Sequence, residues 1–406
     1  MPTGRLIPFS PPALTEEDIA AVSAVLRSGW ITTGPKTKEF EQLICQWAGA
    51  ARAACLNSAT AALEIALRLL GIGAGDEVIV PAYTYTASVS PVVHLGATPV
   101  MIDANEDDYG INLAAVRAAV TERTKAIIAV DIAGRMCDYP KLLAIVNEMK
   151  ECFVANSDRQ AALGRIAVIA DGAHSFGAMK YGIKSGAAAD FTTFSFHAVK
   201  NLTTGEGGAL TWKCGLPFDD DELYQEIMLL SLHGQNKDAL AKSEMGSWEY
   251  DVSRIGYKCN MTDIAAALGV SQCKRYGAVL KRRQDVVRKY DRLLTGTMVN
   301  SLDHFAEGSF SSCHLYLVRV ESASLKQRNA IIEAMAEQGV VCNVHYKPLP
   351  LMSGYRRLGF SIDSFPNALK LYENALSLPL HNLLSDDDIE YVASALYSAI
   401  QEGAGR

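Results

Sequence analysis

The strongest constraint on the fold is a series of short, almost entirely apolar runs in roughly the first 250 residues. Unbroken apolar character is typical of strands that are buried on both faces of a sheet. Helical patterns separate the first four runs, and this alternation predicts a largely parallel sheet flanked by helices. The short connection between the last two runs predicts a local hairpin or an antiparallel strand. The runs are EVIVPAY (77–83), PVMID (99–103), KAIIAVD (125–131), IAVIAD (166–171), FTTFSF (191–196) and GALTW (208–212).

The C-terminal part of the sequence predicts a second, smaller unit. A long helical pattern runs from Met261 to about Leu294, and two strand-like runs follow, HLYLVRV (314–320) and VVCNVHY (340–346). Further helical patterns lie around 325–338 and 386–402. We therefore expect an α/β fold with two domains. The large domain would cover 1–275, including the N-terminal segment, and a small α+β domain would cover 276–406.

Composition argues against several classes of partner. The chain has 38 Lys and Arg against 45 Asp and Glu, so it lacks the positive excess that binds nucleic acid or a membrane surface. It has no apolar run of about 18 residues, and its start lacks the pattern of a secretory signal. The nine cysteines form no C-x-x-C pair, and the histidines form no H-E-x-x-H motif. We therefore expect reduced thiols, a cytoplasmic location and no metal.

The segment FSFHAVKNLTTGEGGAL (194–210) contains the first candidate catalytic residue, Lys200. Lys200 follows a predicted buried strand, and ligands of α/β proteins bind at the carboxyl ends of strands. Partial desolvation at such a place lowers the pKa of a lysine and leaves a neutral amine that can attack a carbonyl. The alternative is an ordinary surface lysine in a loop.

A second segment, IADGAHSFGA (169–178), contains Asp171 and His174. Asp171 ends an apolar run, and a carboxylate at that place needs a partner, for which a protonated pyridine nitrogen is one candidate. A turn or N-cap aspartate is the alternative. His174 could stack on a ring or bond to its substituent, although a lone histidine is more often structural.

A third segment, CLNSATAAL (55–63), places Ser58, Ala59 and Thr60 where a predicted strand leads into a helix. The free backbone N–H groups of a helix N-terminus can hold a phosphate. Simple capping of the helix is the alternative. Together the three segments provide a lysine, a carboxylate and an amide nest, which are the groups that pyridoxal phosphate requires from a protein.

With these segments the chain resembles the DegT/DnrJ/EryC1/StrS family of sugar aminotransferases, which are fold-type I pyridoxal-phosphate enzymes. The resemblance covers essentially the whole chain. The motifs SGWITTGP, SFHAVKN and GYKCNMTDI are most similar to the UDP-4-amino-4-deoxy-L-arabinose aminotransferase branch. The matching stretches are PFS (8–10), SGWITTGP (28–35), NSATAAL (57–63), VIVPAYTYTAS (78–88), GATPVMID (96–103), DGAHSFGA (171–178), SFHAVKNLTTGEGG (195–208), GYKCNMTDIAAALG (256–269) and LSLPLH (376–381).

The resemblance implies a role for the residues that match the family motifs. Lys200 would hold the cofactor covalently and move a proton during the reaction. Asp171 would pair with the ring nitrogen, and His174 would lie beside the phenolic oxygen of the cofactor. Tyr85 would stack on the cofactor ring.

The resemblance also implies phosphate and substrate contacts. The phosphate would be held by Ala59, Thr60 and Ser195, and the phosphate of a neighbouring subunit's cofactor by Asn260 or Lys258. The resemblance thus predicts a homodimer with shared active sites. Substrate contacts are expected at Trp30, Thr32 and His345, for which packing at a domain interface is the alternative.

The reaction that the resemblance implies is amino-group transfer in amino-sugar and polysaccharide biosynthesis. An amino acid, with glutamate as the expected donor, would give its amino group to a nucleotide-linked keto-sugar in a ping-pong sequence. One rival within the family is a sugar dehydratase that binds the pyridoxamine form, and those members have histidine where this chain has Lys200. Another rival is a regulator or sensor that binds without turnover.

Overall fold

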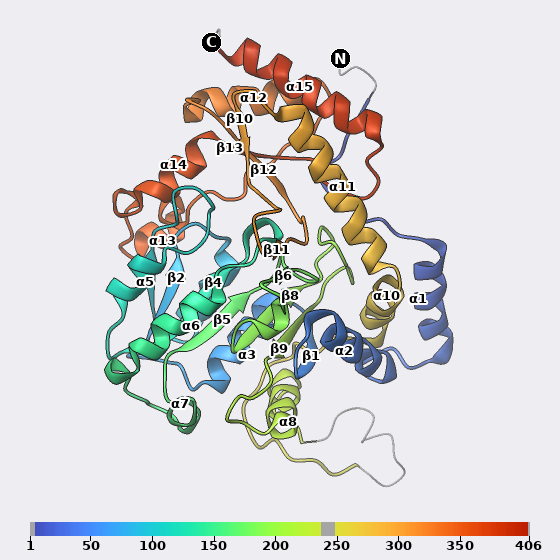
Figure 1. Ribbon diagram of the computed structural model, residues 1–406. Helices are drawn as coiled ribbons and strands as arrows, with labels where there is room; N and C mark the ends of the chain where they lie inside the picture. Colours follow the sequence, from blue (N-terminus) through green and yellow to red (C-terminus); the bar gives the residue numbers. More distant parts are fainter. Residues whose placement is uncertain (1–4, 237–247, 405–406) are drawn as a thin grey trace.

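A seven-stranded sheet forms the centre of the large unit in the computed structural model, which describes residues 5–236 and 248–404 (Figure 1). The strand order is β1-β9-β8-β5-β4-β2-β3. Neighbouring strands from β3 to β8 pair in parallel, whereas β9 pairs antiparallel with both β8 and β1. This confirms the predicted, mostly parallel sheet. The strands are β1 (Arg52–Leu56), β2 (Glu77–Pro81), β3 (Thr98–Ile102), β4 (Thr124–Val130), β5 (Ala167–Asp171), β8 (Phe191–Ser195) and β9 (Gly208–Trp212).

Helices cover both faces of this sheet, which explains why its strands are apolar throughout. Val78 and Val80 of β2 pack in a core with α3 (Ala59–Leu69) and α8 (Asp220–Ser231). Ile79, between them, points to the opposite face and packs with α5 (Leu113–Ala119) and α6 (Tyr139–Glu148). Because successive strand residues face opposite sides, both sets of positions must be apolar.

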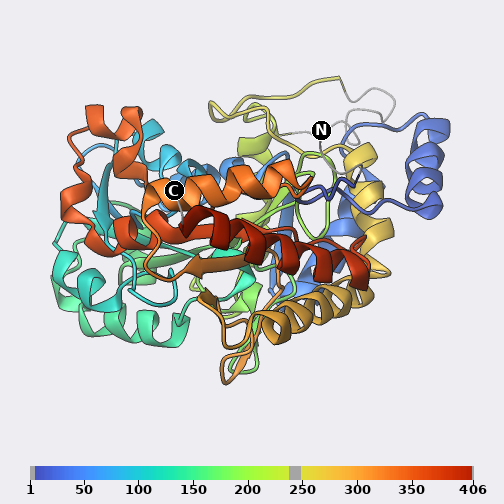
Figure 2. The same cartoon turned by 90° about the horizontal axis from the view of Figure 1, so that it is seen from above.

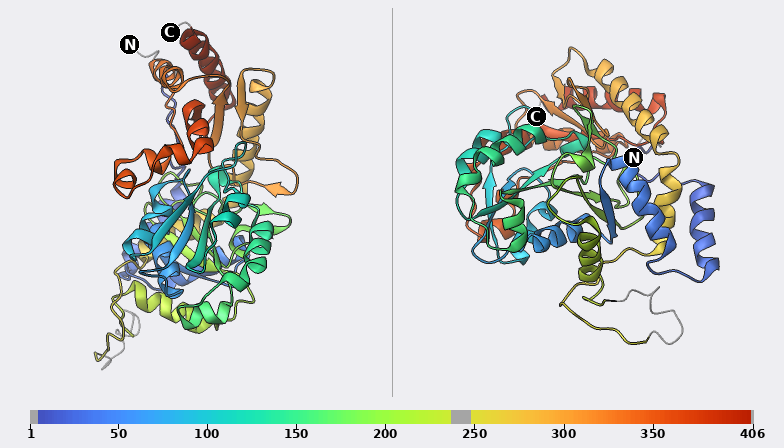
Figure 3. Two further views of the ribbon diagram at one scale, coloured as in Figure 1. Left: turned by 90° about the vertical axis from the view of Figure 1, so that its left-hand side faces the viewer. Right: turned by 60° about the horizontal axis from the view of Figure 1, so that its bottom comes forward.

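The other end of the sheet is covered by two helices that lie far apart in the sequence. Phe40 of α2 (Pro35–Ala48) packs against Gly269 of α10 (Asp263–Cys273), where a Cβ would lie 2.5 Å from the phenyl ring. Glycine is therefore required for this close approach. Helix α1 (Glu16–Ser28) packs on α10 at the periphery of the molecule (Figure 3).

The long helical pattern that starts at Met261 is two helices in the structure. Helix α10 ends at Cys273, and α11 (Tyr276–Leu294) begins after a break at Lys274 and Arg275. The guanidinium of Arg275 donates to Asp18 Oδ1 of α1 at 2.7 Å, and the backbone of Arg275 departs from helical angles. The prediction of one continuous helix was wrong, since the backbone leaves the helical path at Arg275, whose side chain binds α1.

The small unit is built on an antiparallel sheet in the order β10-β12-β13, with α12 and α15 packed over it (Figure 2). The predicted strand over 340–346 is not a strand. Its backbone makes isolated bridges, Val340 with Ile7 and Asn343 with Ser377, before it turns toward the large unit. The third strand is β13 instead. These elements are β10 (Val299–Ser301), β12 (Tyr316–Val320), β13 (Ala375–Leu378), α12 (Leu325–Glu337) and α15 (Asp386–Ala404).

Short elements fill the connections. Residues 151–165, whose role the sequence leaves open, contain α7 (Asp158–Leu163) and dock on the end of α3. There Ser157 Oγ donates to the Leu70 carbonyl at 2.8 Å. Further short elements are α4 (Ser90–His94), α13 (Ser353–Arg357), α14 (Pro366–Asn374), and a small sheet of β6 (Met179–Lys180), β7 (Ile183–Lys184) and β11 (Ser309–Phe310).

The N-terminal segment runs along the small unit toward the large one. Ile7 lies in the apolar core of the small unit, and its N–H donates to the Gly339 carbonyl at 2.8 Å. Helix α11 starts in the large-unit core with Tyr276 and ends in the small-unit core with Leu294. The domain boundary near residue 275 stays a prediction, and we propose that the junction falls within α11.

Residues 5–236 and 248–404 contain neither a membrane-spanning helix nor a cluster of metal ligands. Within these ranges no helix combines the length and apolar character needed to cross a membrane. No group of three His, Cys, Asp or Glu side chains in the same ranges is arranged as metal ligands would be.

Candidate active site

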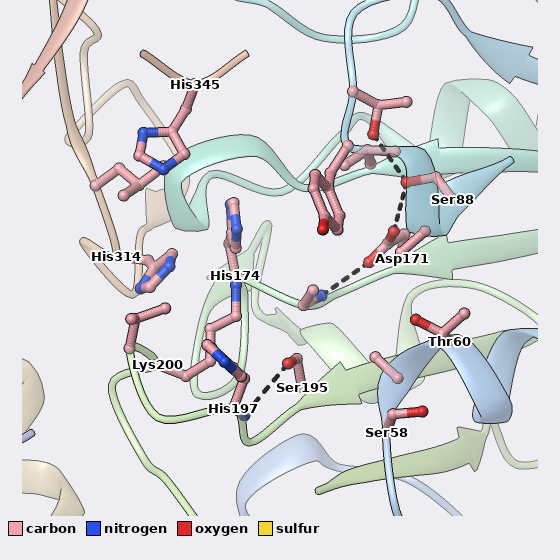
Figure 4. Close-up of a pocket in the computed structure, with 18 of the residues that line it drawn as sticks. Ser58, Thr60, Ser88, Asp171, His174, Ser195, His197, Lys200, His314 and His345 are labelled. Atoms are coloured by element: carbon pink, nitrogen blue, oxygen red, sulfur yellow. Dashed lines mark hydrogen bonds between the residues drawn. The ribbon is translucent and has the colours of Figure 1, made fainter. Parts of the chain in front are cut away.

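A cavity of about 430 Å³ lies between the carboxyl ends of the sheet strands and the small unit (Figure 4). Ligands of open α/β sheets bind at this place. In Figure 4, Asp171, Ser88, Thr60 and Ser58 lie on one side of the cavity, and His314, His345 and Lys200 lie on the other. The residues predicted from the sequence that line it are Ala59, Thr60, Tyr85, Asp171, His174, Ser195, Lys200 and His345.

The N-terminus of α3 forms one end of the cavity. Ser58 is the N-cap, and its Oγ accepts the Ala61 N–H at 3.1 Å, which leaves the N–H groups of Ala59 and Thr60 for a ligand. Gly208 of β9 packs against this turn, and a Cβ there would lie 2.3 Å from the Ala59 nitrogen. This close-packed amide nest, with Ser195 alongside, fits a phosphate group.

Asp171 ends β5 with its buried carboxylate facing the cavity. Oδ2 accepts the Ser88 hydroxyl at 2.6 Å, and Oδ1 accepts the Ala173 N–H at 3.1 Å. Within the described ranges no cationic side chain forms an ion pair with this carboxylate, so its charge is held by neutral donors. A buried carboxylate in this setting fits a protonated ring nitrogen, which would supply the missing positive charge.

Lys200 lies on the loop that follows β8. Burial lowers the pKa of its amine to about 8, and the Asp171 carboxylate partly opposes that shift. The loop is held by a side-chain amide, because Gln272 Oε1 accepts the Thr203 N–H and its Nε2 donates to the Thr203 carbonyl. Lys200 thus presents an amine that is readily deprotonated in a fixed loop, as a nucleophile for a carbonyl requires.

His174 stands at the centre of the cavity. Its Nδ1 accepts the Ala133 N–H at 3.2 Å, and its Nε2 lies 3.1 Å from the Tyr346 hydroxyl. Ala133 has a left-handed conformation, with φ of 59°. Such a residue costs about 1 kcal/mol or more, and here it points the N–H at the histidine.

The wall on the small-unit side contains residues that sequence reasoning missed, His314 and Tyr346. His314 lies two residues before the start of β12, and Tyr346 follows His345 in a segment without regular structure. Polar residues at one end of an expected strand, the first of 314–320 and the last of 340–346, were the available signal. That signal was weak because these strands are antiparallel, and the rule that places ligands at strand ends concerns parallel sheets.

The N-terminal segment closes part of the mouth of the cavity. The Phe9 ring stacks on His345 with centroids 5.4 Å apart, and Ser10 Oγ donates to the Val199 carbonyl at 3.1 Å. Both Phe9 and Ser10 line the cavity. The segment therefore links the small unit to the residue that precedes Lys200.

Three predicted site residues lie outside the cavity of this chain: Trp30, Thr32 and Asn260. Trp30 and Asn260 instead meet at Thr33, whose carbonyl accepts the indole N–H at 3.2 Å and whose hydroxyl accepts the Asn260 amide at 2.7 Å. Lys258 donates to the Asn260 carbonyl oxygen. Within one chain these residues form a cluster apart from Lys200.

The fold and the site define the class of protein as a fold-type I transferase built to hold pyridoxal phosphate. Residues 12–397 match the model of the DegT/DnrJ/EryC1/StrS aminotransferase family, and the chain belongs to this family. The match confirms the family and the enzyme class that the sequence predicted.

Similar proteins cover nearly the full chain. MJ1066 of Methanocaldococcus jannaschii, an uncharacterized protein, is 38% identical over 407 residues, 98% of each chain. The spore coat polysaccharide biosynthesis protein SpsC of Bacillus subtilis is 36% identical over 401 residues, again 98% of each chain.

Solved structures agree with the fold and support the cofactor. "Putative sugar aminotransferase Spr1654 from Streptococcus pneumoniae" in its PMP form has a TM-score of 0.95 and 51% identity, covering 98% of this chain and 100% of that one. The same protein is known in a PLP form. PseC of Helicobacter pylori, an aminotransferase of pseudoaminic acid biosynthesis, has a TM-score of 0.85 and 28% identity, with coverage of 98% and 100%.

Proposed function

We propose that the protein transfers an amino group from an amino acid to a nucleotide-linked keto-sugar, with pyridoxal phosphate as cofactor. The observation that supports this most directly is the partly buried Lys200 amine in the same cavity as Asp171 and the amide nest of α3. Pyridoxal phosphate supplies a carbonyl carbon for the amines and a ring that accepts electrons from the carbon that loses its proton.

Each residue of the cavity has a role that follows from its position. The N–H groups of Ala59 and Thr60 bind the phosphate and orient the ring, and Asp171 keeps a proton on the ring nitrogen by its charge. The Lys200 amine would hold the cofactor between turnovers and would remove and return the proton at the reacting carbon. One lysine serves both halves of the reaction, so the kinetics are ping-pong.

The names of relatives support a sugar as the acceptor. SpsC is a polysaccharide biosynthesis protein, and PseC takes part in pseudoaminic acid biosynthesis. The similarity of SGWITTGP, SFHAVKN and GYKCNMTDI to the UDP-4-amino-4-deoxy-L-arabinose branch rests on sequence motifs alone, so that sugar is one proposal among several. Glutamate as the donor is likewise proposed from the resemblance.

Lys200 also bears on the dehydratase alternative. A dehydratase of this family has histidine at that position, and without the lysine it cannot hold the cofactor covalently. Lys200 lies in the cavity, which favours transamination. Continuous turnover in the presence of an amino donor would also separate an enzyme from a binding-only sensor.

The decisive experiment is a substrate panel. The purified protein, loaded with pyridoxal phosphate, is incubated with glutamate and with UDP-, dTDP- or GDP-linked keto-sugars. We expect an amino-sugar and 2-oxoglutarate in equal amounts from at least one of them. Sugar dehydration without consumption of glutamate would contradict the proposal.

We further propose a symmetric dimer in which Asn260, or Lys258 next to it, contacts the cofactor of the neighbouring subunit. The position of Asn260 outside its own cavity supports this arrangement. Asn260→Ala alone must first be shown to impair activity. Mixing it with inactive Lys200→Ala under subunit exchange should then restore about a quarter of the sites, because half the dimers are mixed and each has one intact site. No recovery despite exchange would exclude the shared site.

A further inference from the structure

Two histidines lie side by side in the wall of the cavity. The ring centroids of His174 and His314 are 4.3 Å apart, and both side chains are buried (Figure 4). Burial, together with the nearby Lys200, lowers the pKa of each imidazole well below its ordinary value. Both rings are therefore neutral at pH 7, and each has its proton on only one of two nitrogens.

The partners of His174 determine which nitrogen is protonated. The Ala133 N–H donates to Nδ1 at 3.2 Å, and a nitrogen that accepts a hydrogen bond has no proton of its own. The proton of His174 is therefore on Nε2. That N–H points to the Tyr346 oxygen at 3.1 Å, so the tyrosine accepts this hydrogen bond.

The hydrogen-bond partner of His314 places the proton of that ring on the other nitrogen, Nδ1. Its Nδ1 lies 3.0 Å from Asn201 Oδ1, and the Asn201 amide nitrogen donates to the Ser312 carbonyl at 2.7 Å. The Ser312 carbonyl fixes the orientation of the amide, because a flipped amide would place two oxygens together. The Asn201 oxygen accordingly faces His314, which must have its proton on Nδ1. The Nε2 of His314 keeps a free electron pair.

Tyr346 can donate a hydrogen bond because it accepts one from His174. Its hydroxyl accepts from His174, so its own proton is available to another group, and the described residues give it no further hydrogen bond. The Tyr346 ring lies 5.9 Å from the Tyr85 ring, and Tyr346 lines the cavity with Asp171. Asp171 is a residue that the proposed function places at the cofactor, and the family resemblance implies that Tyr85 stacks on the cofactor ring.

We propose that Ala133 and Asn201 lock the two adjacent histidines in opposite tautomers, with His174 Nε2 as a hydrogen-bond donor and His314 Nε2 as an acceptor. In the same proposal, the Tyr346 hydroxyl, oriented by His174, donates a hydrogen bond to the bound cofactor. The second part rests on the proposed cofactor, whereas the first part does not. Tyr346 is then a cofactor-binding residue on the small-unit side of the site, and Ala133 and Asn201 are positioning residues.

The tautomers are tested on the cofactor-free protein by long-range ¹⁵N–¹H NMR of histidine, with His174→Gln and His314→Gln used for assignment. We expect the proton on Nε2 of His174 and on Nδ1 of His314. The same tautomer in both rings, or a charged ring at pH 7, would overturn the inference. In Tyr346→Phe the proton of His174 should stay on Nε2, because Ala133 holds it there. A switch to Nδ1 would show that the tyrosine determines the tautomer and would also overturn the inference.

The role of Tyr346 is tested by binding of pyridoxamine 5′-phosphate. Tyr346→Phe should weaken binding about three- to tenfold, the effect of one hydrogen bond. Tyr397→Phe is the matched control, since it removes a tyrosine hydroxyl of α15 that bonds to the Leu293 carbonyl of α11 outside the cavity, and it should bind like the parent. Equal binding by Tyr346→Phe and the parent would refute the contact. Failure of the parent to bind either cofactor form would instead refute the proposed function.

Discussion

The two walls of the cavity are held in place by different means. On one side, Asp171 and Ser195 end neighbouring strands whose register is set by a ladder of backbone pairs. On the other side, His314 and Tyr346 lie outside regular strands. His314 is positioned by single contacts across the chain, such as its N–H donating to the Ala133 carbonyl at 2.9 Å.

This difference indicates a division of roles. A side chain at the end of a buried strand cannot move without disturbing the sheet, so the strand-end wall suits groups that need fixed geometry for chemistry. The small-unit wall depends on fewer contacts and can change from one family member to another without loss of the sheet. Substitutions of Asp171 in the first wall, and of Lys200 on the loop that follows β8, should therefore reduce turnover, whereas those in the second wall should mainly change affinity.

The largest effect is expected from Lys200→Ala. Turnover should fall by about 10⁴-fold or more, because both the anchoring amine and the proton carrier are lost. Binding of pyridoxamine phosphate should persist, since Asp171 and the amide nest remain. In the parent, borohydride should trap the cofactor on Lys200, as peptide mass spectrometry can verify, and Lys274→Ala should leave that label in place. A label on another lysine would refute the role of Lys200.

Asp171→Asn should have the next largest effect. The substitution keeps the shape but removes the charge that holds a proton on the ring nitrogen, so kcat should fall by about 10²- to 10³-fold. Steady-state kinetics with cofactor in excess would measure this change. Normal kcat would mean that the carboxylate only accepts the Ser88 and Ala173 bonds.

The lowered pKa of Lys200 predicts a dependence of stability on pH in the cofactor-free protein. The amine titrates at about 8 in the fold against an ordinary value of 10.5, so protonation in the folded state is unfavourable. The penalty is on the order of 3 kcal/mol at neutral pH, from about 1.4 kcal/mol per pKa unit.

The direction of this pH dependence can be measured by comparing the free energy of unfolding of the parent with that of Lys200→Met. The unfolded chain binds more protons between pH 8 and 10.5, so this group makes the parent more stable as the pH rises through that window. Lys200→Met lacks the penalty and should be more stable than the parent at pH 7. In chemical denaturation the difference in free energy of unfolding between the two proteins should narrow toward pH 10. A difference that is constant with pH would contradict the assigned pKa.

Gly208→Ala tests the amide nest. The added Cβ would come within 2.3 Å of the Ala59 nitrogen and must displace the start of α3. The dissociation constant of pyridoxal phosphate should rise about tenfold or more, as expected for displaced phosphate donors. Gly277→Ala, where a Cβ meets only Trp47 at 3.7 Å, is the matched control and should bind normally. Equal binding by both variants would show that the nest does not hold the phosphate.

The smallest effect is expected from His345→Gln in the other wall. His345 Nδ1 lies 2.8 Å from Ser377 Oγ and its ring stacks on Phe9. The KM for the keto-sugar should rise roughly three- to tenfold with little change in kcat, the signature of lost binding rather than lost chemistry. A fall in kcat as large as that of Asp171→Asn would remove the distinction between the two walls.

The sequence predicted the strand-end wall because local patterns determine it. An apolar run that ends in Asp171 identifies both a buried strand and the edge at which it stops, and Ser58 marks the helix start. The segment 340–346 has a similar apolar pattern but bends away after two isolated bridges. His314 and Tyr346 could not be placed from the sequence, because their positions depend on Ala133, Asn201 and other residues far along the chain.

The path of the N-terminal segment has a consequence for how the protein is made. Residues 7–10 are synthesised early, yet Ile7 pairs with Gly339, and the Pro8 carbonyl lies 3.1 Å from His381 Nε2. Contacts between residues so far apart in sequence form late and slowly in folding. The mouth of the cavity is therefore completed only after residue 381 has left the ribosome, so a chain truncated before that residue cannot form the finished site.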